Sequence, residues 1–304
     1  MIKKSINLLL LTAATFALAA CSTPPATKTY ETQDVETQIL FERISKPIKI
    51  TEKTIIVDAR SSFDFAMTHA PGSVNLSWKE FAVVKPPVPG LMKDDLYPEA
   101  LRLARLGIQP NSSVVIASYG DQSKGDEGRL AWTLIYMGVK DVQIASLDSL
   151  GLRFSNLVNP PPQASAVPWK PVVAPSILTD RKEVLSIGLT KAVPTQHILD
   201  VRTNAEYTEK VKVGFKTHKP DLRAVNIPFN EFFDRSGRPN LNMVQRLQGI
   251  QIKPEHRIVV ISNNGIRSGA VTFALLSMGY KNVANYAGGW TDLLNSVKGK
   301  RARK

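Results

Sequence analysis

The stretch from Ile258 to Gly279, IVVISNNGIRSGAVTFALLSMG, decides the fold of this chain. Its first four residues, Ile258–Ile261, are β-branched and apolar, which predicts a short buried strand. A tight loop follows, and then apolar residues recur at helical spacing. A strand, a glycine-containing loop and a helix in this order aim main-chain N–H groups at the loop's centre, where the helix dipole and the charge of Arg267 favour an anion. The predicted anion-binding loop consists of Ser262, Asn263, Asn264, Gly265, Ile266, Arg267 and Ser268.

This loop resembles the active-site loop of rhodanese-like sulfurtransferases, in which a strand leads through a CxxGxR pattern into a helix. Gly265 and Arg267 stand where that family has its glycine and arginine. In the family, the cysteine at the first loop position accepts a sulfane sulfur and passes it to a thiol or to cyanide. Here that position is Ser262. The resemblance therefore implies the sulfurtransferase fold without its nucleophile.

Ser262 is a poor substitute for a catalytic cysteine. Sulfur transfer needs a thiolate, and a cationic loop favours one by lowering the pKa of a thiol from about 8.5. A serine hydroxyl cannot form a persulfide, and a serine nucleophile needs an adjacent general base. The nearest histidine in the sequence, His256, is expected on the far side of the strand. Serine and asparagine in this loop instead fit turn and helix-cap chemistry, which is compatible with anion binding. We therefore assign no catalytic residue, although Ser262 stands at the position of the family's nucleophile.

Two alternatives stay open. One is an active thiosulfate-type sulfurtransferase that works without a cysteine, and the other is a purely structural envelope protein with an inert loop. A phosphatase with the same fold is disfavoured for two reasons. Those relatives need a cysteine at the first loop position, and they need five residues between that cysteine and the arginine. Four residues separate Ser262 from Arg267.

The plan of strand, Asp-x-Arg, loop and helix occurs twice along the chain. Asp58 and Asp200 are 142 residues apart, and Gly138 and Gly279 are 141 apart, so the repeat keeps its register. The segment HAPGSVN at 69–75 resembles the rhodanese entry motif H-x-P-G-A-x-N. We assign structural roles to the Asp-x-Arg residues, which can cap and pin neighbouring backbone.

Alternating strands and helices predict an α/β protein with two tandem rhodanese-like domains, each a mainly parallel sheet flanked by helices. The length of 304 residues is sufficient for two domains. The predicted boundaries are 1–20 for a lipoprotein signal peptide, 21–46 for a tether, 47–156 for a first domain without cysteine, 157–175 for a proline-rich linker, 176–297 for a second domain with Ser262 in place of cysteine, and 298–304 for a basic tail.

The N-terminus, MIKKSINLLLLTAATFALAACS, has two lysines followed by a short apolar run. A membrane-spanning helix needs about 20 residues, so the run indicates a signal peptide. The segment Leu18–Cys21 resembles the bacterial lipobox, whose cysteine carries lipid. Cys21 is the only cysteine, so its lipidation would leave no thiol for disulfides or catalysis. Ser22 follows, where an aspartate would imply inner-membrane retention. The expected location is the bacterial cell envelope, lipid-anchored, at the outer membrane facing the periplasm.

The formal net charge is +13, and basic residues gather at the C-terminus: Lys298, Lys300, Arg301, Arg303 and Lys304. The tail is interpreted first as a solvated, disordered segment. The alternative is contact with an anionic envelope surface, worth about 1 kcal/mol per basic residue near lipid. Export and the lack of interleaved aromatic residues argue against nucleic-acid binding.

No cofactor and no metal are expected. Asp121, Asp126 and Glu127 are close in sequence, but their spacing matches no familiar metal motif such as the calcium loop. We therefore predict a rhodanese-family envelope lipoprotein without sulfurtransferase activity, which acts as an anion-binding or interaction module. Its partners would be the membrane, through lipid on Cys21, and a small oxyanion such as thiosulfate, sulfate or phosphate.

Overall fold

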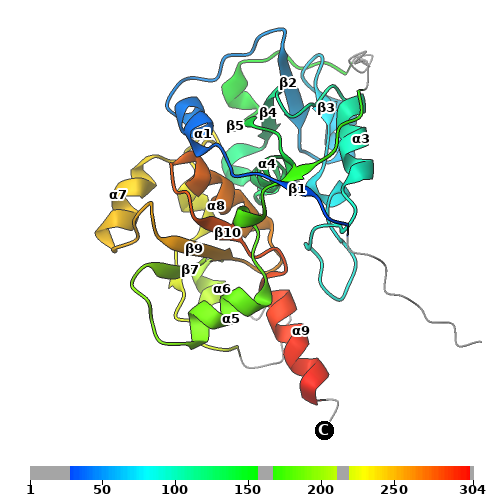
Figure 1. Ribbon diagram of the computed structural model, residues 1–304. Coiled ribbons are helices and arrows are strands. Elements are labelled where there is room, and N and C mark those ends of the chain that lie inside the picture. The colour runs from blue at the N-terminus through cyan, green and yellow to red at the C-terminus, as the bar shows by residue number, and fades with distance from the viewer. Residues whose placement is uncertain (1–27, 157–166, 211–218, 302–304) are drawn as a thin grey trace, which may run out of the picture.

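The computed structural model describes residues 28–156, 167–210 and 219–301. Two α/β domains make up this part of the chain, and each is built on a four-stranded parallel sheet (Figure 1). The strand order is β3-β2-β4-β5 in the first domain and β8-β7-β9-β10 in the second, so the sheets share one topology. The predicted tandem α/β architecture is confirmed.

The elements of the first domain within the described residues are β2 (Thr54–Asp58), α2 (Ser62–Met67), β3 (Val74–Asn75), α3 (Tyr97–Arg105), β4 (Ser113–Ser118), α4 (Asp126–Met137) and β5 (Asp141–Ser146). Those of the second are α5 (Arg181–Leu189), β7 (Gln196–Asp200), α6 (Asn204–Tyr207), β8 (Val225–Asn226), α7 (Asn242–Gly249), β9 (Arg257–Ile261), α8 (Ile266–Ser277), β10 (Val283–Asn285) and α9 (Gly289–Arg301). Short 3-10 helices lie at Trp78–Glu80, Gly120–Gln122, Asp148–Leu150, Pro175–Ile177 and Phe229–Phe232.

The register of the central strands shows that the repeat is also a repeat in space. Asp58 pairs with Ala117 across β2 and β4, and Asp200 pairs with Ile261 across β7 and β9. The next residue along the chain is Ser118, the last residue of β4, in the first domain and Ser262, directly after β9, in the second. Because carboxyl ends of parallel strands meet at one edge of a sheet, these serines occupy equivalent positions in the two domains.

The domains meet along α4 and α8, which pack side by side (Figure 1). Glycine makes this close approach possible. A Cβ on Gly128 would lie 2.6 Å from the Cβ of Ala270, and a Cβ on Gly269 would lie 2.7 Å from the Cδ of Arg129. Both helices are therefore buried on almost every side, which explains why their sequences are apolar without a clear polar face.

The tether predicted over residues 21–46 is wrong for its described part. β1 (Glu31–Thr32) pairs in parallel with β6 (Val172–Val173), and α1 (Thr37–Ile44) packs against β5 and α8. Leu40 is buried in the first core, and Arg43 forms an ion pair with Asp141 at 2.6 Å. Tyr30 and Val35 pack on the same core, and Ile44 packs on the core of the second domain. A few spaced apolar residues, strand pairing and ion pairs therefore dock a segment that is otherwise polar. Residues 21–27 lie outside the described part.

The linker predicted over 157–175 is also shorter than expected. From residue 167 onward the chain packs on the first domain: Trp169 is buried, and its indole N–H donates to the carbonyl oxygen of Ile108 at 3.1 Å. Residues 157–166 lie outside the described part. At the other end, the main chain of α9 continues to Arg301, so the first residues of the predicted tail are helical. Residues 302–304 are not described, and the role of the tail stays a prediction.

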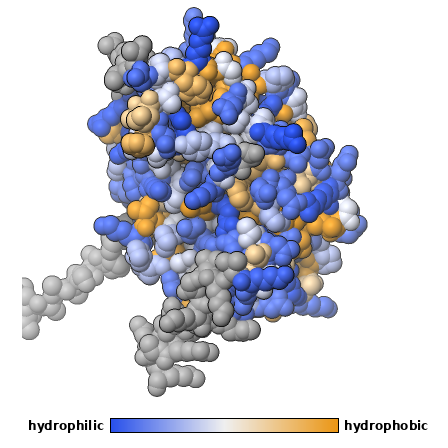
Figure 2. Space-filling model, turned by 180° about the vertical axis from the view of Figure 1, so that it is seen from behind, coloured by the Kyte–Doolittle hydropathy of each residue, from blue (hydrophilic) through white to orange (hydrophobic). Residues whose placement is uncertain are grey.

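Figure 2 shows the face opposite that of Figure 1, on which apolar residues are dispersed among polar ones, as is common on globular domains. Among the helices of the described ranges, none combines the length and apolarity needed to cross a membrane.

Candidate functional site

The predicted anion-binding loop lies between β9 and α8. Gly265 precedes α8 with φ of 78°, a left-handed conformation that favours glycine. A Cβ at this position would also overlap the carbonyl oxygen of Ala287. Main-chain N–H groups of Trp290 and Thr291 hold the loop from the other side, by donating to the carbonyl oxygens of Ser262 and Asn263 at 2.9 and 3.0 Å. The loop therefore has one well-defined shape.

Ser262 is buried inside this loop and has 1% of its surface exposed. Its Oγ lies 3.0 Å from the Oγ of Ser268, and Ser268 donates in turn to the Oδ1 of Asn285 at 2.7 Å. A hydroxyl has only one hydrogen, so Ser262 must donate to Ser268. Ser262 forms no hydrogen bond to an imidazole or a carboxylate of the described residues. His256, the nearest histidine in sequence, pairs instead with His197 at 2.9 Å, before β9 begins.

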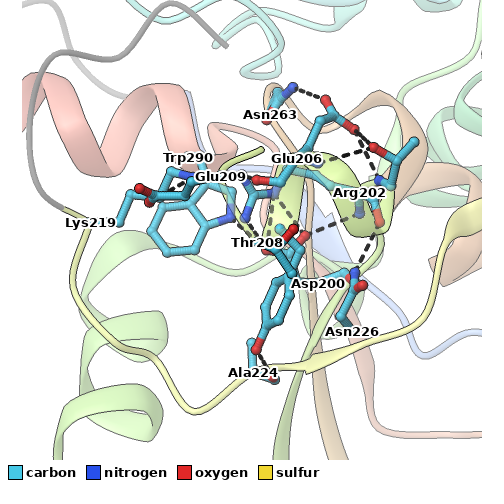
Figure 3. Close-up of polar contacts among 12 residues, drawn as sticks. Asp200, Arg202, Glu206, Thr208, Glu209, Lys219, Ala224, Asn226, Asn263 and Trp290 are labelled. Carbon is cyan, nitrogen blue, oxygen red and sulfur yellow. Dashed lines mark hydrogen bonds and ion pairs between the residues drawn. The ribbon is translucent and has the colours of Figure 1, made fainter. Parts of the chain in front are cut away.

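The charge of Arg267 is neutralised by a partner that the sequence did not reveal. Glu206, on α6, accepts from both terminal nitrogens of Arg267 at 2.6 and 2.9 Å. Asn263 donates to the same carboxylate at 2.8 Å (Figure 3). The hydrogen bonds from Arg267 are the main reason why the pKa of Glu206 is lowered to about 2. The expectation that Arg267 adds a full positive charge to the loop is therefore wrong, because it assumed a free guanidinium.

The backbone of the loop keeps unused donors. The main-chain N–H groups of residues 263–267 form no hydrogen bond to any described residue. Helix N-termini leave such groups without intrahelical partners, and they are suited to bind anions. The capacity of this loop for an anion therefore resides in its backbone and its dipole.

The Asp-x-Arg motifs are structural, as predicted. Asp200 and Arg202 form a buried ion pair at 2.5 Å, and the side-chain amide of Asn226 donates to both of their carbonyl oxygens, at 2.8 and 2.9 Å (Figure 3). Trp290 adds a hydrogen bond from its indole to Asp200 at 2.9 Å. The first domain repeats this arrangement with Asp58, Arg60 and Asn75.

The loop lies at the domain interface. A Cβ on Gly90, in the first domain, would overlap the carbonyl oxygen of Asn264. Arg129 of α4 donates to the carbonyl oxygens of Gly265 and Gly90, both at 2.7 Å. Arg129 could not be recognised from the sequence, because nothing local distinguishes an arginine that reaches into another domain. Its only signal is a basic residue directly before the apolar run of α4, at 130–132.

The equivalent loop of the first domain carries different chemistry. Gly125 precedes α4 with φ of 91°, and Glu127 stands at the position of Arg267. Glu127 is buried and bonded to the hydroxyl of Ser123, and burial raises its pKa to about 7. Asp126 accepts from the indole of Trp78. Within the described ranges, no group of three or more His, Cys, Asp or Glu side chains is placed to hold a metal ion.

Two α/β domains of equal topology, with a strand-loop-helix site in the second, define a class of tandem sulfurtransferase-like proteins. The chain belongs to the rhodanese family, because the family model for the rhodanese-like domain matches residues 42–147 and 188–296. It is 32% identical over 253 residues to SseA of Mycobacterium bovis, covering 76% of this chain and 78% of that protein. It is 28% identical over 264 residues to the thiosulfate sulfurtransferase of Azotobacter vinelandii, and this match covers 84% of this chain and 92% of that protein.

The fold is also that of SseA from Escherichia coli, a 3-mercaptopyruvate sulfotransferase, with a TM-score of 0.62 and 21% identity over 85% of this chain and 99% of that one. The predicted family and fold are confirmed. The assignment of an anion to the loop is tested by none of these comparisons and stays a prediction.

Proposed function

We propose that this rhodanese-family protein does not transfer sulfur and serves as an anion-binding module, with the ligand at the loop formed by residues 262–267. One observation carries the proposal: Ser262 stands at the end of β9, where the family resemblance places the cysteine, and its hydroxyl is committed to Ser268. Cys21 precedes both domains in the sequence and is the only cysteine in the chain. The folded domains therefore offer no thiolate to carry a sulfur atom.

The ligand that fits the loop is a small oxyanion such as thiosulfate, sulfate or phosphate. Consecutive N–H groups at a helix start can hold its oxygens, and the helix dipole favours its charge. Because Glu206 already neutralises Arg267, the anion gains little from that side chain. We therefore expect affinity on the order of millimolar, which corresponds to about 4 kcal/mol.

Calorimetric titration of the full chain with sulfate, thiosulfate and phosphate at two ionic strengths tests this proposal. Gly265→Ala should abolish binding, because the added Cβ overlaps Ala287 and distorts the loop. Gly279→Ala is the matched control: Gly279 also has a positive φ, of 90°, but no atom lies within 4 Å of its Cβ position. Equal binding by the two variants, or no binding by the wild type, would refute the proposal. The second result would favour a purely structural protein.

We further propose that the protein is a lipid-anchored component of the bacterial envelope, at the outer membrane facing the periplasm. The support is the order of charge, apolar run, small residues and Cys21 at the N-terminus, all of which lie outside the described residues. Basic residues at the C-terminus would add contact with an anionic envelope surface.

A further inference from the structure

Arg129 is a buried cation without a carboxylate partner. Its side chain is completely buried, and no ion pair among the described residues includes it. Its neighbours are neutral: two carbonyl oxygens, the sulfur of Met92 at 3.6 Å, and the rings of Trp132 and Trp78, whose centroids lie 4.6 and 5.8 Å from the guanidinium carbon. Its Nε atom has no hydrogen-bond partner. A buried charge is costly unless something compensates for it.

The position of Arg129 indicates that an anion in the loop would compensate for its buried charge. It donates to the carbonyl oxygen of Gly265 at 2.7 Å, and the side chain of Asn285 donates to the same oxygen at 3.3 Å. A peptide unit is planar and trans, so its C=O and N–H point in opposite directions. The N–H on the other side of this peptide belongs to Ile266, which is one of the unused donors of the loop. A donor on the oxygen polarises the peptide and strengthens that N–H toward an anion.

Arg129 also joins the domains at this point. The same guanidinium donates to Gly90, which lies against Asn264. A single side chain of the first domain thus holds both the loop of the second domain and the segment that covers it.

We propose that Arg129 is a positioning residue for the anion loop: it orients and polarises the Gly265–Ile266 peptide, and it supplies the positive potential that the Arg267–Glu206 pair does not. This inference rests on the proposed function, since it assigns the source of the charge at that same loop.

A thiol placed at position 262 measures this potential without any ligand. The background is the full chain with Cys21→Ser and Ser262→Cys, in which the new thiol is the only one. Its pKa is read from thiolate absorbance as pH is raised, and we expect a value below about 8.5. Adding Arg129→Met should raise that pKa by about one unit, as expected for loss of a nearby charge at an effective dielectric constant of about 20.

Two controls separate charge from packing. Arg105→Met removes an exposed arginine of α3, whose charge is screened by solvent, and should leave the thiol pKa unchanged. Arg129→Lys keeps the charge but not the two-pronged donation, so it should retain more of the low pKa than Arg129→Met does. A thiol pKa that is the same with methionine, lysine and arginine at 129 would overturn the proposal.

If Arg129→Met does not fold, as judged by circular dichroism, the test uses the same background with two further substitutions that leave Arg129 in place. A thiol pKa at or above about 8.5 with Arg129 in place and the Glu206–Arg267 pair removed by Glu206→Gln and Arg267→Gln would also overturn the proposal. Failure of the wild type to bind sulfate, by contrast, would refute the anion module and leave this measurement valid.

Discussion

Glu206 holds the guanidinium of Arg267 with both carboxylate oxygens, at 2.6 and 2.9 Å. The same carboxylate accepts the main-chain N–H of Thr203 at 2.9 Å, as part of the capping box that begins α6. One residue therefore starts a helix and neutralises the loop beside it. A ligand anion would share this site with a carboxylate that belongs to the protein.

Removal of that carboxylate should improve anion binding. In Glu206→Gln, Arg267 keeps its charge but loses its charged partner, and a guanidinium can then bind two oxygens of a ligand. We expect at least about tenfold tighter binding of sulfate, because a hydrogen bond to a charged group contributes about 1.5–3 kcal/mol and tenfold corresponds to about 1.4 kcal/mol. Calorimetry measures the change. Glu209→Gln is the control, because Glu209 lies just beyond α6 and pairs with Lys219 instead. Equal affinities in the two variants would contradict the prediction.

Sulfur transfer should be absent in the wild type and should appear in part with Ser262→Cys. The loop and helix N-terminus are already placed to lower a thiol pKa. Treatment with thiosulfate should add the mass of one sulfur atom to Ser262→Cys in a Cys21→Ser background, and cyanide should release it as thiocyanate. Ser277→Cys is the matched control, since Ser277 is buried in the last turn of α8 and its hydroxyl has no partner. Turnover by the wild type above a denatured control would refute our proposal.

Glu127 should make the protein less stable as pH rises. Burial raises its folded pKa to about 7 from the ordinary glutamate value of 4.5, so the folded state keeps a proton that the unfolded state releases between these values. The free energy of unfolding should therefore fall from about pH 4.5 to pH 7 and then level off. Glu127→Gln should remove this loss, and it should be at least about 1 kcal/mol more stable than the wild type at pH 8.

Urea unfolding at pH 4 and pH 8 measures the difference. The two proteins should have similar stability at pH 4, where Glu127 is protonated in both states. Asp148→Asn, at an exposed site of the first domain, controls for the loss of one negative charge. A constant difference between Glu127→Gln and the wild type at both pH values would argue for a packing effect instead of a titration.

The anchor depends on one residue. Cys21→Ser should abolish acylation and release the protein from membranes, because the sulfur that would carry lipid is lost. Fractionation followed by mass spectrometry of the mature protein checks this outcome, with Ser22→Ala as the neighbouring control. An unmodified Cys21 thiol in the membrane fraction would contradict the lipoprotein assignment.

Much of the fold could be predicted because its signals are local. The apolar run before Ser262 predicted a strand, and β9 (Arg257–Ile261) confirms it. Asp180 is a typical capping residue at the start of α5, and its side chain accepts from the main-chain N–H of Glu183 at 2.9 Å. The docking of residues 31–44 could not be predicted in the same way, since their composition resembles a tether and their stability comes from partners such as Val172 and Asp141.

By itself, the sequence determined the tandem α/β plan, the strand-loop-helix site and the replacement of cysteine by Ser262. Each of these depends on residue types and spacings within one short segment or its repeat. The charge at the site was decided only by tertiary structure. Glu206 reaches Arg267 across 61 residues, and Arg129 reaches Gly265 across 136. Electrostatic energy depends on distance in space, and the fold alone brings one carboxylate to the expected cation and places another cation behind the loop.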